Sequence, residues 1–417
     1  MGLYYFFAAL LLLQALVSLR GGARYLRYFR RELSAPAPDF TPFATVVVPC
    51  RGLEEGLRDN LASLFGQDYP AYEIIFAVDS AGDPALAVIE RVRLTCGNAA
   101  SPATRVVVAG AASGSGQKVH NLIAGVSAAD ARGEVFVFVD SDARPGREWL
   151  RALVAPLAGE NTGAATGYRW FIPSTKPASH LRAVWNASIA SALGENSRGN
   201  FCWGGSTAIR RDTFTRLRMI ERWRGTLSDD FALTRALQDA RLPIHFVPRC
   251  LTASHADCTP RELIEFTTRQ LKITRVYAPR LWRIVLVSNL LFVAVFYGGL
   301  ALALARYWRG QPCVLPLALV TALYALGSAK ALLRLRAVAL AFAPGIKIWR
   351  AGTLAAHVLL WPLASALFLY NAVAAACSRR IRWRGITYEL KSPSETVIIN
   401  ATRTAETSAA GDAARRA

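Results

Sequence analysis

Two carboxylates one residue apart, Asp140 and Asp142, are the first side chains in this sequence with obvious chemical potential. They end the segment 133–145 (GEVFVFVDSDARP), a continuous Val/Phe run typical of a strand buried on both faces. Side chains at i and i+2 of an extended chain point the same way, and two carboxylates there repel unless a cation lies between them. The pattern favours a Mg²⁺ or Mn²⁺ site shared with a substrate diphosphate. The simpler alternative is a solvated turn that caps the next helix.

Polar residues also follow two other expected strands, at Pro49 to Arg51 and at Asp79. Short apolar strands alternate with helices, which predicts an α/β domain with a mostly parallel sheet between two layers of helices. Because ligands bind beyond the carboxyl ends of such strands, these residues are expected to form one polar rim. Strands are expected at 44–49, 73–79, 105–109, 163–171, 200–210 and 244–247, and helices at 60–67, 84–94, 118–128, 148–157, 181–193 and 227–237. The domain is expected to occupy residues 40–258.

The composition points to a membrane-associated protein. Lys and Arg number 49 against 29 Asp and Glu, a formal net charge of +20, and 53% of the residues are hydrophobic. Zinc-finger and basic-zipper patterns are missing from the sequence and much of the positive charge flanks apolar segments, so an anionic membrane face is favoured over nucleic acid. Seven scattered cysteines argue against a disulfide framework and for a reducing compartment.

Apolar segments at both ends of the chain predict membrane helices. The run 3–19 precedes a group of arginines, the reverse of a cleaved signal peptide, so 1–22 is expected to be an anchor with its C-terminal flank in the cytoplasm. Within a membrane region at 284–377, spans are expected at about 284–305, 313–333 and 353–377. The basic segment 259–283 predicts a helix lying in the membrane interface, or equally one packed on the soluble domain.

The side of the membrane that holds the C-terminus depends on the number of crossings. Three spans would place it outside, whereas the arginines of 378–400 favour a cytoplasmic tail segment. We adopt the cytoplasmic tail and leave the number of crossings open, since 337–346 is apolar but too short to cross alone. Residues 401–417 are predicted to be disordered.

The order of the motifs resembles that of family-2 glycosyltransferases with the GT-A fold. The motifs that carry the resemblance are Val48-Pro49-Cys50-Arg51-Gly52, Asp79, Lys118-Val119-His120-Asn121-Leu122, Asp140-Ser141-Asp142, Trp203-Gly204-Gly205-Ser206, Leu227-Ser228-Asp229-Asp230 and Arg269-Gln270-Leu271-Lys272-Ile273. The membrane layout is similar to that of the ceramide glucosyltransferase branch and its bacterial relatives, including the hopanoid-associated glycosyltransferases. The resemblance implies a Rossmann-like GT-A domain in the cytoplasm, flanked by membrane helices.

The resemblance also implies a role for each motif. Nucleotide-sugar contacts are implied for Pro49, Arg51, Asp79, Lys118, Asn121 and Asp140. Asp142, with Asp140, would hold the Mg²⁺ or Mn²⁺ ion, and Asp230 would be the catalytic base. The acceptor side would be formed by Trp203, Gly204, Gly205, Ser206 and Asp229. The diphosphate or the lipid interface would be met by Arg269, Lys272 and Arg275, in a motif where Lys272 and Ile273 replace the family's Arg and Trp.

The chemistry of sugar transfer needs these residue types. A leaving nucleoside diphosphate requires a cation, and a lipid hydroxyl requires a carboxylate as general base. One base without a nucleophile partner favours a single displacement with inversion. Taken singly, these residues also have structural explanations. Asp229 and Asp230 could simply be acidic residues in the first turn of a helix, and Glu54 and Glu55 are expected to be solvated. His255 is expected to be a buried structural histidine, although it could instead be a further metal ligand.

The sequence therefore predicts an enzyme that moves a hexose, with glucose expected, from a UDP-sugar to the hydroxyl of a membrane lipid such as ceramide. Hopanoid and diacylglycerol are alternative acceptors. A processive polysaccharide synthase would share these motifs. It is disfavoured because Ile273 stands where the family's last motif has a Trp, which such synthases use beside the growing chain. A catalytically dead membrane scaffold is the non-enzyme alternative, and a nucleic-acid binder would not explain carboxylates gathered at strand ends.

Overall fold

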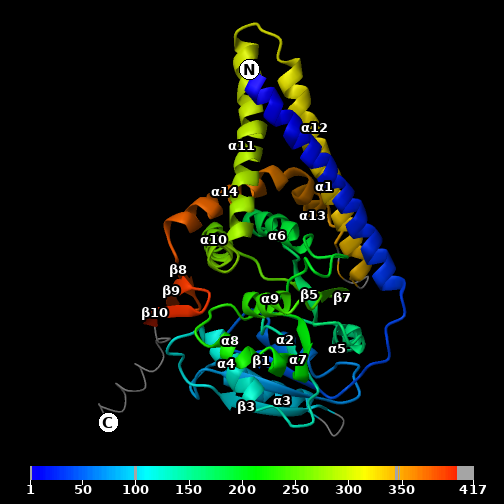
Figure 1. Ribbon diagram of the computed structural model, residues 1–417, viewed down its shortest axis with the longest axis vertical. Coiled ribbons are helices and arrows are strands. Elements are labelled where there is room, and N and C mark those ends of the chain that lie inside the picture. Colours follow the sequence, from blue (N-terminus) through cyan, green and yellow to red (C-terminus); the bar gives the residue numbers. More distant parts are fainter. Residues whose placement is uncertain (1, 98–100, 343–345, 347, 402–417) are drawn as a thin grey trace.

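A seven-stranded, mostly parallel sheet forms the centre of the protein's lower part (Figure 1). The structure, a computed structural model, describes residues 2–97, 101–342, 346 and 348–401. The strand order is β3-β2-β1-β4-β6-β5-β7, with only β6 antiparallel to its neighbours. The strands are β1 Ala44–Pro49, β2 Tyr72–Val78, β3 Ala103–Val108, β4 Val135–Phe138, β5 Ala164–Phe171, β6 Thr207–Arg210 and β7 Ile244–Ser254. This GT-A-like arrangement confirms the fold class expected from the sequence.

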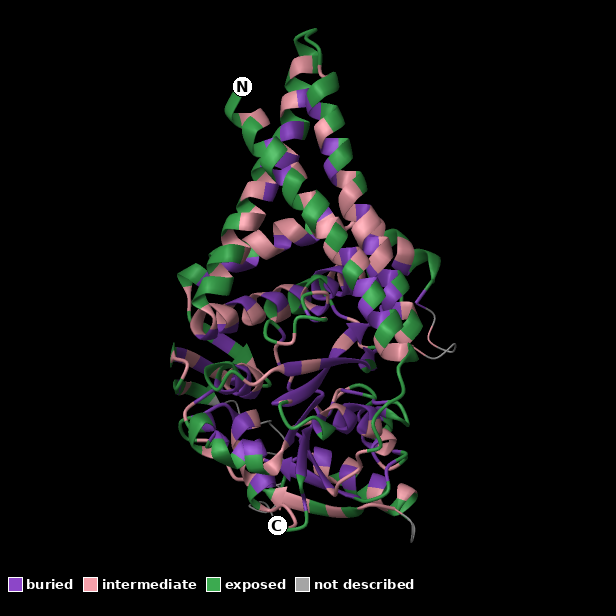
Figure 2. Cartoon of the chain, turned by 45° about the vertical axis from the view of Figure 1, so that its right-hand side comes forward, coloured by how far each residue is buried: buried purple, intermediate pink, exposed green. Residues whose placement is uncertain are grey.

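Helices cover both faces of the sheet because alternate residues of each strand point to opposite sides. Val46 and Val48 of β1 pack with one group of helices, whereas Val47 packs with the other. The first group is α2 Leu57–Ser63, α3 Ala85–Cys96 and α5 Trp149–Val154, which a 3₁₀ turn η1 Ala155–Ala158 follows. The second group is α4 Gln117–Ser127, α7 Arg211–Arg216, α8 Met219–Trp223 and α9 Asp229–Asp239. In Figure 2 the central strands of the sheet are buried, and β1, β2 and β4 are buried along their whole length, whereas the edge strand β3 is partly exposed.

Two predicted elements of the domain differ from those observed. The strand expected at 200–210 is reduced to β6, because 203–206 form a turn closed by the hydrogen bond from Ser206 N to Trp203 O (3.0 Å). The last strand runs from Ile244 to Ser254 rather than ending at 247, with an irregularity in its register against β5. The turn at 203–206 places Trp203 beside the carboxyl ends of the strands.

Three helices are long and apolar enough to cross a membrane, and they converge at the end of the molecule away from the sheet (Figure 1). They are α1 Gly2–Ser34, α11 Pro279–Trp308 and α12 Val314–Ala341. Two more, α13 Ala351–Leu359 and α14 Trp361–Cys377, meet at an angle of 59°. Lys330 Nζ of α12 donates a hydrogen bond to Ser18 Oγ of α1 (2.7 Å), which ties the first and later apolar helices together.

The apolar helices differ in extent from the segments predicted to span or line the membrane. The first helix continues to Ser34 instead of ending at 22, because its arginines follow on the same helix. The third expected span, 353–377, is broken at Leu360, where Pro362 in the first turn of α14 lacks the N–H that a continuous helix needs. The boundary predicted at 283, between the basic segment and the membrane region, falls inside α11. The short apolar stretch 337–346 begins within α12, which ends at Ala341. The tail predicted to be disordered lies outside the described residues from 402 onward.

The segment between the apolar helices and the tail forms a second sheet that the sequence analysis did not predict. Its strands β8 Arg380–Trp383, β9 Ile386–Ser392 and β10 Glu395–Ala401 are antiparallel in the order β10-β9-β8. Alternating buried residues, Ile386, Tyr388 and Leu390, pack with Leu227 and Tyr277 of the larger domain. This alternation was a readable strand signal. The segment 378–400 is therefore a folded part of the domain rather than a tail.

Candidate active site

A cavity of about 1180 Å³ opens beyond the carboxyl ends of β1 and β4. At one end its lining is charged and includes Arg51, Asp140 and Asp142. At the other end it is lined by apolar side chains of α6 Pro177–Ala190, α10 Pro260–Tyr277, α11 and α14, among them Trp185 and Phe368. The cavity therefore joins the polar rim of the sheet to the base of the apolar helices.

Asp140 and Asp142 each face a cation. Lys118 Nζ at the start of α4 lies 2.7 Å from Asp140 Oδ1, and Arg169 Nη2 of β5 lies 2.7 Å from Asp142 Oδ1 and 3.8 Å from Asp140 Oδ2. Burial raises the pKa of Asp140, but Lys118 and Arg169 outweigh it and hold the pKa below the usual value. Both carboxylates line one cavity and pair with cationic side chains, which a solvated turn would not require.

The acidic pair at the start of α9 occupies two different environments. Asp229 is 6% exposed and its Oδ1 lies 3.1 Å from Lys118 Nζ, so this one lysine joins Asp140 to Asp229. Burial raises the pKa of Asp229 to about 6, with Lys118 opposing the rise. Asp230 lines the cavity, and its Oδ1 accepts hydrogen bonds from Ser228 Oγ and from Phe231 N (2.8 Å). Among the described residues Oδ2 of Asp230 has no hydrogen-bond partner, which leaves it available to a hydroxyl.

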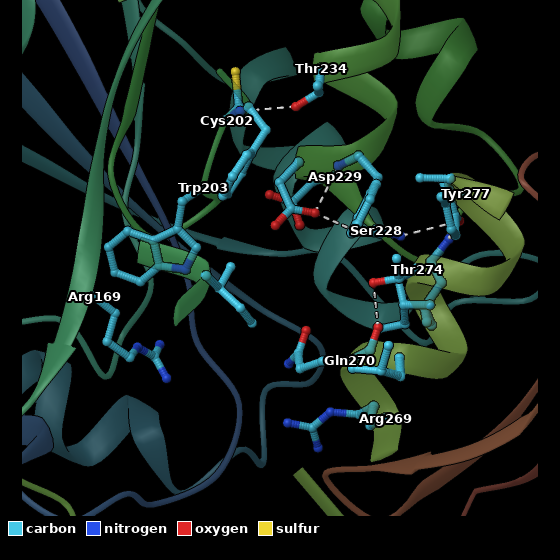
Figure 3. A pocket seen from close by; sticks show the side chains of 18 of the residues that line it. Arg169, Cys202, Trp203, Ser228, Asp229, Thr234, Arg269, Gln270, Thr274 and Tyr277 are labelled. Carbon is cyan, nitrogen blue, oxygen red and sulfur yellow. Dashed lines mark hydrogen bonds between the residues drawn. The ribbon is translucent and has the colours of Figure 1, made fainter. Parts of the chain in front are cut away.

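Tyr277, at the end of α10, holds the start of α9 in place. The phenol oxygen of Tyr277 accepts hydrogen bonds from Leu227 N (2.8 Å) and Ser228 N (3.3 Å). These are two of the backbone donors next to a helix start that need a partner. Figure 3 shows Tyr277, Ser228 and Asp229 in this order along one wall of the cavity.

The residues expected to contact the nucleotide divide into two groups. Pro49, Arg51 and Asn121 line the cavity, but Asp79 lies behind Arg51, whose Nη1 is 3.3 Å from Asp79 Oδ2. Burial raises the pKa of Asp79 to about 6, and a hydrogen bond with Asp83 adds to the rise. The amide of Asn121 donates to Cys50 O (3.3 Å) and Ala77 O (3.2 Å), so it joins the ends of β1 and β2.

Only Trp203 of the Gly-rich motif faces the cavity. Its ring lies 5.3 Å from the guanidinium of Arg169, within the range of a cation–π contact. Gly205 lies beneath this ring, and the fully buried Ser206 accepts a hydrogen bond from Trp149 Nε1 (2.8 Å). A Cβ atom at Gly204 would clash with the carboxylate of Asp229 and lie 2.6 Å from Lys118 Nζ. Gly204 thus allows the Lys118–Asp229 pair to form, and Gly205 makes room for the Trp203 ring.

Gly204→Ala is therefore expected to separate Lys118 from Asp229 and to lower transfer activity. Overpacking of this kind costs about 1–3 kcal/mol of stability. Activity and urea unfolding in detergent would be compared with Gly66→Ala, where the added Cβ meets nothing within 4 Å. Equal activity of the two variants would show that close approach at Gly204 is unimportant.

The basic residues of α10 do not act together. Arg269 lines the cavity, where its guanidinium lies 5.6 Å from the ring centre of Phe266 and 5.4 Å from that of Trp383. Lys272 Nζ instead donates to Arg380 O (2.8 Å), and Arg275 Nη1 donates to Ala376 O (2.8 Å) at the C-terminus of α14. The helix turns these two side chains away from the cavity and toward its neighbours. Of the three basic residues named from the motif, the structure brings only Arg269 to the site.

Arg169 and Arg384 line the cavity but were not found from the sequence. Arg169 pairs with both rim carboxylates, as described above. Glu54, which was expected to be solvated, accepts a hydrogen bond from Ser141 Oγ (2.7 Å) and forms an ion pair with Arg384 of the second sheet. No motif marked Arg169 or Arg384, since only the folded chain places them here. His255 is exposed, so the expectation of a buried structural histidine was wrong.

The donor set at the rim suits a hard divalent cation that is shared with phosphate. Within the described residues, no group of three or more His, Cys, Asp or Glu side chains is arranged to hold a metal ion. Asp140 and Asp142 nevertheless present carboxylate oxygens to the cavity, and the side chain of Asp142 is 32% exposed. Mg²⁺ commonly takes one or two carboxylates and completes its shell with water and substrate phosphates. The residues present therefore fit such an ion.

Several known proteins are similar to this chain. The ceramide glucosyltransferase of Komagataella phaffii (strain GS115 / ATCC 20864) is 33% identical over 75 residues, which are 18% of this chain and only 15% of that enzyme. The mannosyltransferase PcManGT from Pyrobaculum calidifontis, solved with GDP-Man and Mn²⁺, shares 18% identity over 89% of this chain and 98% of its own, with a TM-score of 0.45. Glucosyl-3-phosphoglycerate synthase from Mycobacterium tuberculosis, solved with Mn²⁺, UDP-Glc and phosphoglyceric acid, shares 18% identity over 55% of this chain and 78% of its own, with a TM-score of 0.35.

The sequence profile of one family covers nearly the whole chain. It matches residues 6–396, which include the first apolar helix, the sheet domain, the later apolar helices and most of the second sheet. A match of this extent establishes the family and, with it, a sugar-transferring enzyme. This chain belongs to glycosyl transferase family 21.

Proposed function

We propose that this enzyme transfers a hexose, with glucose expected, from a UDP-sugar to the hydroxyl of a membrane lipid such as ceramide, with inversion at the sugar carbon. Its sheet domain would lie on the cytoplasmic side of a membrane crossed more than once by the apolar helices. The proposal assigns the diphosphate of the donor to the charged end of the cavity and the lipid to the apolar end.

The continuity of the cavity carries this proposal. Asp140 and Asp142 line one end of it, and Val285 of α11 and Phe368 of α14 line the other. Both helices belong to the apolar set, and α11 is long enough to cross a membrane. A lipid hydroxyl can therefore reach the acidic residues while its hydrocarbon chains stay beside apolar helices. A soluble acceptor would need no such apolar end.

Asp230 is the proposed base. It takes the proton of the lipid hydroxyl while that oxygen bonds to the anomeric carbon, and the bond from this carbon to the β-phosphate oxygen breaks. The electron pair leaves with the nucleoside diphosphate, whose added charge cations at the rim stabilise. A divalent ion bound at Asp142 and Asp140 would supply Lewis acidity toward the diphosphate oxygens.

The direct test is product identification. Purified protein in detergent would be incubated with Mn²⁺ or Mg²⁺, a panel of UDP-sugars, and ceramide, hopanoid and diacylglycerol acceptors, followed by mass spectrometry. One hexose added to one lipid is the expected product. A ladder of product lengths would favour a processive synthase, and no consumption of any UDP-sugar would favour a scaffold.

We expect the activity to depend on a divalent metal ion bound at Asp140 and Asp142. Asp142→Asn should lower turnover about 100-fold and weaken Mn²⁺ binding in the presence of UDP, because it removes a charged ligand. Mn²⁺ binding would be followed by electron paramagnetic resonance. Asp39→Asn is the control, since the side chain of Asp39 is 93% exposed. Unchanged Mn²⁺ affinity in Asp142→Asn would place the metal elsewhere.

A further inference from the structure

The turn between β8 and β9 carries a charged side chain to the cavity. Arg384 lines the charged end, where its Nη1 donates to Arg51 O (2.7 Å) and its Nη2 pairs with Glu54. Arg384 and Gly385 form a two-residue turn with φ of 47° and 76°. Such turns prefer Asn, Asp or Gly at the first position, and arginine is disfavoured at positive φ. The turn geometry therefore does not explain why this residue is an arginine.

The hairpin is held rigidly against the elements that build the site. The phenol oxygen of Tyr388 accepts a hydrogen bond from Gln117 N (3.3 Å), the residue before Lys118. Ile381, Ile386 and Leu390 pack with Leu227 and Tyr277 at the start of α9 and the end of α10. A Cβ at Gly225 would clash with Ser394 O, so the second sheet and the domain are in close contact. These contacts hold the turn that carries Arg384 in a fixed position beside the cavity.

Arg384 belongs to a group of three arginines at the cavity, with Arg169 and Arg269. Arg269 has no ion pair or hydrogen bond within the described residues and lies near the rings of Phe266 and Trp383. Burial, together with the charges of Arg384 and Arg169, lowers the pKa of Arg269 to about 10. Figure 3 shows the guanidinium groups of Arg169 and Arg269 directed toward one another across the cavity. Like charges that point toward one another across a cavity favour an anion between them.

We propose that Arg384 is a catalytic residue that binds the β-phosphate of the donor and stabilises the leaving nucleoside diphosphate. This inference rests on the proposed sugar transfer. As the bond from the sugar carbon to the β-phosphate oxygen breaks, the electron pair stays on that oxygen and the guanidinium donates hydrogen bonds to it. Charge-assisted contacts of arginine with phosphate are among the stronger hydrogen bonds in proteins. The side chain is 32% exposed, so it can turn from Glu54 to a ligand without unpacking the hairpin.

The test compares Arg384→Met with Arg382→Met, which removes an exposed arginine from the same hairpin outside the cavity lining. UDP and UMP binding would be measured by calorimetry in Mn²⁺. Turnover would be measured with the UDP-sugar and lipid that the product analysis proposed above identifies. Arg384→Met is expected to weaken UDP binding about tenfold with little effect on UMP, and to lower kcat about 100-fold. Arg384→Lys should recover part of both losses, and Arg382→Met should match the wild type.

The possible failures are distinguishable. Arg384→Met that binds UDP and turns over like Arg382→Met would overturn this inference and leave sugar transfer standing. Equal losses of UDP and UMP binding, with a lower unfolding midpoint and no recovery by Arg384→Lys, would make the residue structural and also overturn it. Wild-type protein that binds no UDP in Mn²⁺ and consumes no UDP-sugar would overturn both proposals.

Discussion

Asp230→Asn is expected to lower sugar transfer to the lipid about 10²–10⁴-fold, the usual contribution of a general base. Binding of the UDP-sugar should be retained, because the amide oxygen of asparagine can still accept the hydrogen bonds from Ser228 Oγ and Phe231 N. The amide cannot take the proton of the attacking hydroxyl. Turnover would be measured by mass spectrometry and donor binding by calorimetry.

Asp212→Asn offers a matched control for this variant. Asp212 also lies in the first turn of a helix, α7, and accepts a hydrogen bond from the N–H of the next residue, but it is outside the cavity lining. It should keep wild-type turnover. If Asp230→Asn also turned over normally, Asp230 would not be the base and the mechanism proposed above would be wrong.

Lys118→Met is expected to lose both activity and stability, because it leaves two buried carboxylates without their shared cation. Lys118 Nζ pairs with Asp140 and with Asp229, and its side chain is 14% exposed. Removing one partner of a buried ion pair costs about 3–5 kcal/mol. Urea unfolding in detergent would measure the loss. Lys176→Met, at an exposed lysine, is the control.

The stability that Lys118→Met loses should be larger at high pH than at low pH. A carboxyl whose folded-state pKa is raised costs stability when ionised, and the cost disappears as pH falls toward its unfolded pKa. The pKa of Asp229 is already raised by burial to about 6, and without Lys118 it would rise further. The difference in unfolding free energy between Lys118→Met and the wild type should therefore be larger at pH 8 than at pH 5. A pH-independent difference would mean that the carboxylates are not the cause.

The sequence predicted the elements whose signals are local. The Val/Phe run before Asp140 identified a buried strand, and the short apolar strands around it gave the parallel part of the sheet. The motif around Asp229 and Asp230 located a helix start at the site, since an acidic pair in a first turn is favourable. These features depend on neighbours in the chain, so a single sequence is enough to find them.

What the sequence did not predict depends on contacts between distant segments. Arg169 lies 27 positions from Asp142, and Arg384 lies 330 positions from Glu54, so neither pair has a sequence signature. Lys272 and Arg275 have the expected types and spacing, but β8 and the end of α14 supply carbonyl partners that draw them away. The break between α13 and α14 was missed because Pro362 was read as part of one apolar run.

The second sheet has a consequence for how the protein is made. Its strands follow all the apolar helices that the structure describes, yet Trp383, Arg384 and Tyr388 form part of the cavity wall. A nascent chain on the ribosome therefore lacks part of this proposed active site until α11 to α14 have all been synthesised. Synthesis of the chain would then delay catalysis until the apolar helices are complete, so that an unfinished chain could not use the proposed sugar donor.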